Sequence, residues 1–391
     1  MSFANKLAYA RKVLPAATWR GLRSPVSGPV HLIFAMADHF EPAIDAVDGT
    51  KRVSRSEQER RVEWWCREYP NLVDRWRDEE GHPFVHTYFY PAEQYDEGLM
   101  AALAEHCHEG WGEIEVHLHH GIFEPDTPEN TRRQLVEFRD QMAFRHRCLA
   151  VEEGSAEVRY AFVHGNWALA NSAGGRVCGV DSEMQILAET GCYADMTMPA
   201  SVLHPAQIAK INSLYECALP LDQRAPHRKG HALTAGRAPE TYPIIIQGPL
   251  VIDVASAVRG NKRAIESGEL SETKPLTLHR LTLWKQAQIR VAGRPDWLFI
   301  KLHCHAMNPN QKDVVAGDSF RKFLDDLVTG APERKEILHF VTAREMTNIL
   351  LAACDGRDGN PGDYRDYRFK RLAAVASSPE NSRPVPVSQK G

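Results

Sequence analysis

The sequence predicts an α/β fold in which parallel strands close into a barrel. Segments with the pattern of buried strands alternate with segments of helical periodicity across residues 28–355, and this alternation is typical of parallel βα units. Several strand-like segments also end in histidine, asparagine or aspartate, as strands do at the mouth of a barrel. The number of units favours one barrel over the alternative, an open doubly wound sheet.

The predicted elements follow one another in a regular order. Thr127 and Pro128 mark the start of one helix, because proline fits the first helical position. The expected strands are 30–38, 83–90, 113–119, 159–166, 243–253 and 297–305. The expected helices are 55–78, 94–107, 127–144, 182–190, 318–328 and 343–354.

Accessory segments are expected around this barrel. Residues 1–27 carry five basic side chains and no acidic one, which predicts a basic helix or arm that caps the closed end of the barrel. The alternative for this segment is weak contact with an anionic membrane surface. Residues 200–240 are rich in Pro, His and Arg and predict an irregular insertion near the mouth. Residues 356–391 are expected to form a partly disordered tail, since their Pro- and Ser-rich end has no core-forming run.

Composition limits the class of protein. A chain of 391 residues with 43% hydrophobic and 25% charged residues is typical of globular proteins. A net charge of −4 gives no overall field for binding nucleic acid. The eight cysteines are scattered without a CxxC pair, and the sequence has neither an apolar run of membrane-spanning length nor a signal-peptide pattern. These features predict a cytoplasmic protein with reduced thiols, whose oligomeric state the sequence leaves open.

The segment 113–119 delivers histidines to the barrel interior. Side chains alternate between the two faces of a strand, so the apolar row Ile114, Val116 and Leu118 is expected to meet the helices. His117 and His119 then point inward, at the carboxyl end of the strand where barrel active sites lie.

A second, distant strand repeats this pattern. In 297–305 the apolar row of Leu298, Ile300 and Leu302 is expected to face the helices, which turns His303 and His305 inward. The first strand adds Asp38 and His39 to the same mouth, and the strand over 159–166 adds His164 and Asn166, with Trp167 beside them.

Imidazole and carboxylate groups in this arrangement predict a divalent metal site, with Zn²⁺ as the expected ion. Three protein ligands leave one position open for water, which is the mark of a catalytic site. The bound ion would lower the pKa of that water and polarise a carbonyl oxygen.

The order of several segments resembles that of the polysaccharide deacetylase family. Five segments carry the resemblance, which spans residues 28–355. They are VHTYFYPAEQY, EGWGEIEVHLHHG, ETGCYADMTMPAS, FIKLHCHA and FVTAREMTNIL. The resemblance implies a deformed (β/α) barrel, a divalent metal held by one aspartate and two histidines, and removal of acetyl groups from sugars.

Some positions match the family pattern, and others depart from it. The resemblance implies that Asp38 is the catalytic base, His117 the first metal histidine and His303 the acid that protonates the leaving group. His39 stands where the family has its metal-binding aspartate. The second metal histidine is replaced by Gly121, so that His119 or His120 must substitute, and the family's arginine motif gives way to the segment 164–167.

These observations predict a metal-dependent hydrolase that removes acetyl or related acyl groups from a carbohydrate. The metal ligands are expected to be His117, His119 and His39, with Asp38 as the alternative to His39. Glu115 is expected to hold the second nitrogen of a ligand imidazole. The expected catalytic residues are Asp38, His303 and His305, and the expected substrate-binding residues are His164, Asn166 and Trp167. The alternatives are another metallohydrolase, such as a phosphoesterase or cyclic amidohydrolase, and an inactive glycan-binding barrel.

Overall fold

The chain is built around one large, mostly parallel sheet. The structure is a computed structural model, and it describes residues 3–47, 51–121, 124–175, 177, 179–261 and 264–372. The strands are β1 (Val30–His39), β2 (His86–Pro91), β3 (Gly112–Leu118), β4 (Ala150–Glu152), β5 (Val158–His164), β6 (Cys192–Asp195), β7 (Leu214–Cys217), β8 (Gly230–Ala232), β9 (Ile244–Ile246), β10 (Val251–Ile252), β11 (Ile265–Glu266), β12 (Trp297–Cys304), β13 (Glu336–Val341) and β14 (Phe369–Arg371).

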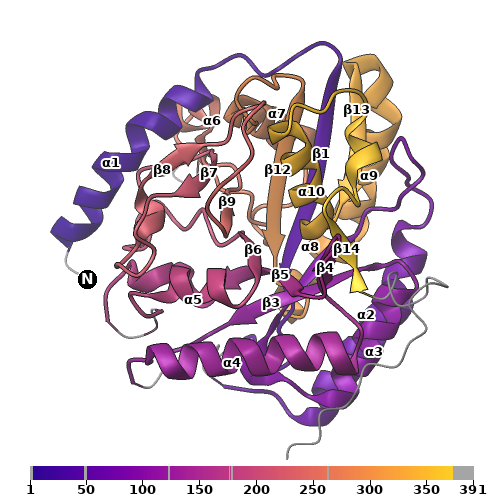
Figure 1. Cartoon of the computed structure of the whole chain (residues 1–391). Coiled ribbons are helices and arrows are strands. Elements are labelled where there is room, and N and C mark those ends of the chain that lie inside the picture. The colour runs from indigo at the N-terminus through magenta and orange to yellow at the C-terminus, as the bar shows by residue number, and fades with distance from the viewer. Residues whose placement is uncertain are drawn as a thin grey trace, which may run out of the picture.

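Helices flank this sheet, as Figure 1 shows. They are α1 (Phe3–Gly21), α2 (Arg55–Val73), α3 (Glu97–His108), α4 (Pro128–Asp140), α5 (Glu183–Glu189), α6 (Val254–Val258), α7 (Leu278–Ala287), α8 (Lys312–Ala316), α9 (Asp318–Arg334) and α10 (Ala343–Cys354). Thr127 caps α4 by accepting a hydrogen bond from the Asn130 amide, with Pro128 at the first helical position. Thr127 and Pro128, which predicted the start of this helix, thus stand at its first positions.

β1 is an interior strand of the sheet that pairs with three others. It pairs in parallel with β12 from His31 to Asp38. On its other edge it pairs first with β13 and then, from Met36 onward, with β2. Because β1 runs between these three strands, its carboxyl end lies beside the carboxyl end of β12, where the sequence places its histidines.

The sheet is open. Its strands follow the order β12-β1-β2-β3-β5-β6-β9-β7-β8, and β7 runs antiparallel to both β9 and β8. Irregular chain lines the free edge of β12: the His303 amide donates to the Gly268 carbonyl at 2.9 Å, and the Phe299 amide donates to the Ile289 carbonyl at 2.9 Å. The predicted α/β class and parallel sheet are confirmed, whereas closure into a barrel is not.

Alternate side chains of the strands enter two different cores. On β1, Leu32 and Phe34 pack in one core, here called the outer core, while Ile33 and Ala35 pack in a second, inner core on the other face of the sheet, together with α10. Nearly every β1 residue is buried, as expected for a parallel strand covered on both faces. The inner core ends at the carboxyl ends of the strands, and the candidate site begins there.

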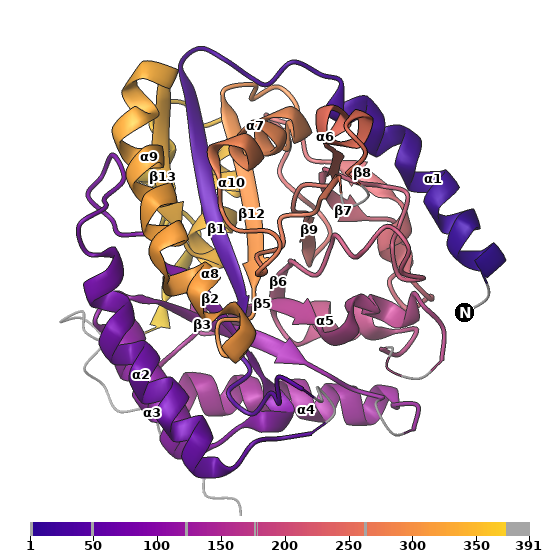
Figure 2. The same cartoon turned by 180° about the vertical axis from the view of Figure 1, so that it is seen from behind.

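The terminal segments pack against opposite parts of the molecule. Figure 2 shows α1 on one side, next to α6 and α7, and α9 with β13 on the other. The Arg20 guanidinium donates to the Ala287 carbonyl at 3.1 Å, tying α1 to the end of α7. At the other end of the chain, β14 pairs with β4, so part of the segment expected to be a tail forms a strand. Residues 373–391 lie outside the described residues.

The apolar character of the helices and the state of the cysteines can be read from the structure. Among the described residues, no helix combines the length and apolar character needed to cross a bilayer. Seven cysteines lie in the described part of the chain, and all of them are free thiols, most of them buried. Burial raises the pKa of the Cys66 thiol to about 12, which disfavours the reactive thiolate there.

Candidate metal centre

Strand alternation sends the histidines of β3 and β12 to the inner side of the sheet. Ile114, Val116 and Leu118 lie in the outer core, as do Leu298, Ile300, Leu302 and Cys304. His117 and His303 occupy the intervening positions. The structure therefore brings together on one side the two histidine pairs that the sequence placed there.

Three buried side chains form the centre of this site. His39 at the end of β1, Glu41 just after it, and His117 on β3 offer ligand atoms that all lie within 4.8 Å of one another. The rings of His39 and His117 have centroids 4.9 Å apart. Such a convergence of imidazole and carboxylate groups could hold a metal ion.

Glu41 lies between two imidazoles. Its Oε1 atom is 3.2 Å from Nε2 of His117 and 3.2 Å from Nε2 of His119. Burial opposes ionisation of this carboxyl, but the contacts with the imidazoles of His117 and His119 outweigh it and hold the pKa of Glu41 well below its usual range. Glu41 is therefore a carboxylate at neutral pH.

His117 presents a lone pair to that carboxylate. Its Nδ1 atom is 2.7 Å from the Val163 carbonyl oxygen, which can only accept, so Nδ1 carries the proton. Burial lowers the pKa of His117, so the ring is neutral and its Nε2 atom is unprotonated. A lone pair and a carboxylate oxygen at 3.2 Å could share a metal ion, and a fixed tautomer of this kind is typical of metal-bound histidine.

His119 is held from both sides. Its Nδ1 atom is 2.9 Å from Oε1 of Glu93, which lies in the 3-10 turn Ala92–Gln94 after β2. Burial lowers the pKa of His119, but the bonds to Glu41 and Glu93 raise it to about 10. The side chains of His119 and Glu93 are 20% and 17% exposed, so the site opens to solvent on this side. Without a metal, His119 carries the positive charge that two carboxylates require.

His303 and His305 complete the cluster. The ring of His305 lies 4.6 Å from that of His39, centroid to centroid, and the ring of His303 lies 6.2 Å from it. Burial and the charge of nearby Lys301 hold the pKa of His303 well below its usual value. His303 is therefore neutral at pH 7, the form that accepts a proton.

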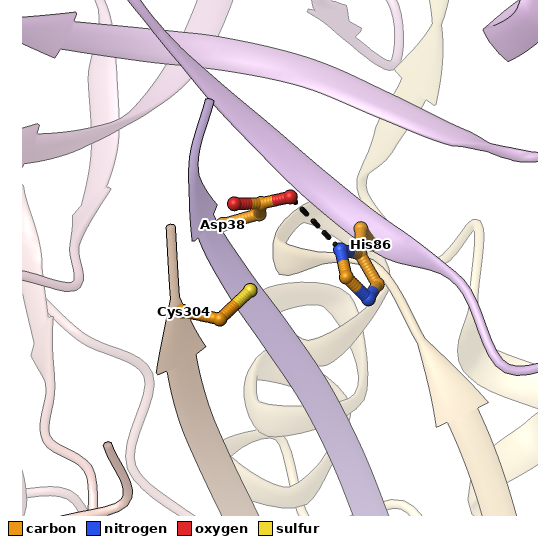
Figure 3. Close-up of side chains that lie close together, drawn as sticks. All are labelled: Asp38, His86 and Cys304. Carbon is orange, nitrogen blue, oxygen red and sulfur yellow. Dashed lines mark hydrogen bonds and ion pairs between the residues drawn. The ribbon is translucent and has the colours of Figure 1, made fainter. Parts of the chain in front are cut away.

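Asp38 does not join this cluster. The next residue, His39, faces inward, and Asp38 points to the opposite side of β1, where Figure 3 shows it with His86 and Cys304. Its Oδ2 atom accepts from His86 Nδ1 at 3.0 Å, and its Oδ1 atom accepts from the Ala306 amide at 2.9 Å. All three side chains are fully or almost fully buried. The geometry corrects the expectation that Asp38 is a base or ligand beside His117, because consecutive residues of a strand face opposite ways.

The three expected substrate-binding residues do not share one surface. His164 is fully buried and lies with His120 and Glu183 in a separate cluster. Asn166 is exposed, and Trp167 is partly buried with its ring 5.3 Å from that of His204. His164 has the same parity on β5 as Phe162, which packs in the outer core, so alternation takes it away from the inner side.

The group that holds the second ring nitrogen of His117 also differs from the expectation. Glu115 accepts hydrogen bonds from the Tyr193 hydroxyl and the Ala161 amide, and the Val163 carbonyl takes the role expected of Glu115. Sequence reasoning missed Glu41 and Glu93. Glu41 follows His39 by two residues, so continuing the strand alternation past the end of β1 would have found it. Glu93 lies in a turn, where no periodicity marks it.

Comparisons with known proteins assign no function to this site. No protein-family model matches the chain, and no curated protein matches it.

Proposed function

We propose that this protein is a hydrolase that depends on a divalent metal ion held by His39, Glu41 and His117, with His119 as a further ligand. The observation that carries the proposal is the contact between His117 and Glu41: an unprotonated Nε2 atom faces a carboxylate oxygen at 3.2 Å, while the Nδ1 proton is committed to the Val163 carbonyl.

The donor set fits zinc better than magnesium or calcium. Imidazole nitrogens with one carboxylate are common zinc ligands, whereas magnesium and calcium prefer oxygen. The carboxylate of Glu93 holds Nδ1 of His119 at 2.9 Å, which leaves Nε2 of that ring to face Glu41 and the ion. A zinc ion in this position would supply an activated water and would polarise the carbonyl group of a bound substrate.

The remaining histidines supply the acid–base chemistry. His303 is neutral and lies on the same side as His39, so it can accept a proton from water and return it to the leaving group. His305, whose ring lies nearer to that of His39, can donate to the developing oxyanion. This assignment replaces Asp38, which is buried on the other side of β1.

For the substrate, we propose an acetylated carbohydrate, and the reaction is removal of the acetyl group. The support is the resemblance of the segments at 85–95, 109–121 and 299–306 to polysaccharide deacetylases, together with a site that is open to solvent at His119. A phosphoesterase, a cyclic amidohydrolase and a glycan-binding protein without catalysis are the other outcomes that the experiment separates.

The test combines metal analysis with an activity screen. Purified protein is assayed for bound zinc and for acetate release from acetylated oligosaccharides, with phosphate esters and cyclic amides as comparison substrates. We expect His117→Ala to lose one equivalent of zinc and all acetate release, while His231→Ala, at an exposed position on β8, keeps both. Unchanged zinc in His117→Ala contradicts the metal assignment. If His117→Ala loses zinc but the wild type releases no acetate, only the choice of substrate is contradicted.

A further inference from the structure

We propose that the protein holds a second zinc ion, in a buried structural site formed by His120, His164 and Glu183. His120 lies two residues after the end of β3, His164 is the last residue of β5, and Glu183 is the first residue of α5. All three side chains are buried, and their ligand atoms lie within 4.8 Å of one another. The residues that form this site have no part in the hydrolase proposed above.

The distances between the three ligand atoms match those of a tetrahedral zinc site. Nε2 of His120 is 2.9 Å from Nε2 of His164 and 3.0 Å from Oε1 of Glu183, and Nε2 of His164 is 3.6 Å from the same oxygen. Ligands about 2.0–2.1 Å from zinc at tetrahedral angles lie about 3.3 Å apart. The triangle of ligand atoms therefore has the size that one zinc ion requires.

Hydrogen bonds to the far side of each ring fix the tautomers. Nδ1 of His120 is 2.8 Å from the carboxylate of Asp126, and Nδ1 of His164 faces the Gly165 carbonyl. Both acceptors require a proton on Nδ1, so Nε2 is the atom of each ring that is left to bind an ion. Two Nε2 atoms and a carboxylate oxygen thus converge on one point, and the Asp126–His120 pair has the carboxylate–histidine arrangement that supports zinc ligands.

Asp126 is itself firmly held. It accepts hydrogen bonds from the Thr131 hydroxyl at 2.8 Å and from the Asn130 side chain at 2.6 Å, both in the first turn of α4. Glu183 is positioned in the same way, since its Oε2 atom accepts from the Ala170 amide at 2.5 Å. The orientation of both carboxylates is therefore set before an ion binds.

A fourth imidazole lies near this cluster without a partner. His227 is fully buried, and both of its ring nitrogens lack a hydrogen-bond partner among the described residues. Its segment is bonded to the chain that carries the cluster, since the Ala225 amide donates to the Ala170 carbonyl at 2.8 Å. Buried polar atoms are rarely left unpaired. The ring nitrogens of His227 lie outside the group of ligand atoms within 4.8 Å of one another, so His227 would have to move toward the other three ligands to supply the fourth that a closed structural zinc site takes.

The second ion would fix an irregular part of the chain that borders the first site. Asn166, Trp167 and Ala170 all have positive φ angles, of 56°, 54° and 48°, in a segment that costs free energy to hold. This segment begins at Gly165, whose Cα lies so close to the ring of His119 that a Cβ atom there would be 2.3 Å from it. A zinc ion at His164 would therefore also hold His119 in place.

The direct test is a zinc-edge anomalous difference map of crystals of the wild-type protein grown with zinc. We expect a peak between Nε2 of His120 and Nε2 of His164, within bonding distance of Glu183. A peak confined to the His39, Glu41 and His117 cluster, or a map without any peak, overturns the second site. The experiment uses the folded wild type, so it does not depend on a variant that folds.

Solution measurements test the same site through metal stoichiometry. We expect the wild type to bind one more equivalent of zinc than Glu183→Gln, and His117→Ala to lose a different equivalent, so that the double variant loses both. Asp126→Asn should keep the fold and weaken zinc binding at this site about 10–100-fold. If folded Glu183→Gln binds as much zinc as the wild type, the proposal is contradicted. The contact between His120 and His164 would then be held by a shared proton. Activity is not the readout, so failure of the hydrolase proposal would leave this result interpretable.

Discussion

Glu41 Oε1 and His117 Nε2 lie 3.2 Å apart in a place where neither atom has a proton to offer the other. The Val163 carbonyl accepts the Nδ1 proton of His117 in a hydrogen bond, and contacts with the imidazoles of His117 and His119 keep the pKa of Glu41 low despite burial. This contact distinguishes the inner cluster from the pair of Asp38 and His86, in which His86 Nδ1 donates directly to the carboxylate. The two neighbouring clusters therefore differ in how the histidine meets the carboxylate: through a lone pair in one, and through a hydrogen bond in the other.

Replacing Glu41 by glutamine should lower the pKa of His119 in the metal-free protein. Burial lowers the pKa of His119, but the pKa reaches about 10 because Glu41 and Glu93 both accept hydrogen bonds from its ring. Loss of one carboxylate removes part of that support, and burial then favours the neutral ring. Histidine NMR titration measures the change, with the exposed Glu109→Gln as control. A His119 pKa that stays near its wild-type value would contradict the assigned contact.

Replacing Gly165 by alanine should weaken metal binding at the inner cluster without unfolding the protein. The added methyl group would lie 2.3 Å from the ring of His119, so the ring must leave the position in which its Nε2 atom faces Glu41. We expect zinc affinity to fall about 10-fold or more, as when the support of a ligand is lost. Competition with a zinc chelator measures it. Gly98→Ala is the matched control, because its methyl group meets only the flexible end of Arg55 at 3.0 Å. Equal affinities of the two variants would rule out this packing.

Glu80 should contribute a pH-dependent part of the stability. Burial raises its pKa, but hydrogen bonds from His339, Asn360 and Arg365 outweigh burial and lower the pKa to about 2 from 4.5. The folded pKa lies below the unfolded one, so this stabilisation is present above about pH 4.5 and is lost as the pH falls toward about 2.

Urea denaturation of wild type and Glu80→Gln across this range measures the effect. We expect the difference in free energy of unfolding to be largest near neutral pH and to shrink below about pH 4.5. Glu63→Gln, on the exposed face of α2, should show no such trend. A difference that stays constant with pH would exclude the role given to the Glu80 charge.

Arg344 should be essential to the packing of the C-terminal segment. This buried side chain binds Glu113 at 2.8 Å and donates to the Phe369 carbonyl at 2.8 Å, which joins α10 to β3 and β14. We expect Arg344→Met to cost about 3 kcal/mol, since removing one partner of a buried pair leaves the other charge uncompensated. Equilibrium denaturation measures the loss. Adding Glu113→Gln to this variant should restore part of the lost free energy of unfolding. If nothing is restored, Arg344 stabilises the protein through its backbone contacts instead.

Local patterns were enough to orient two of the strands that build the site. In β3 and β12 an apolar row alternates with polar residues, and the apolar row must face the helices, so His117 and His303 could be assigned to the inner side from the sequence. In β1 the pattern gives no such answer. Ala35 and Ala37 are apolar like Phe34 and Met36, since both faces of a central parallel strand are buried. The sequence therefore could not decide between Asp38 and His39.

The sequence alone determined the alternation of strands and helices, the parallel sheet and the two inward histidine pairs, because periods of two and of 3.6 residues depend only on neighbouring positions. Only the tertiary structure decided that the sheet stays open, that Glu41 and Glu93 reach His119, and that His120, His164 and Glu183 meet. These outcomes depend on how distant turns and strand ends are placed against one another, and no local period encodes that placement.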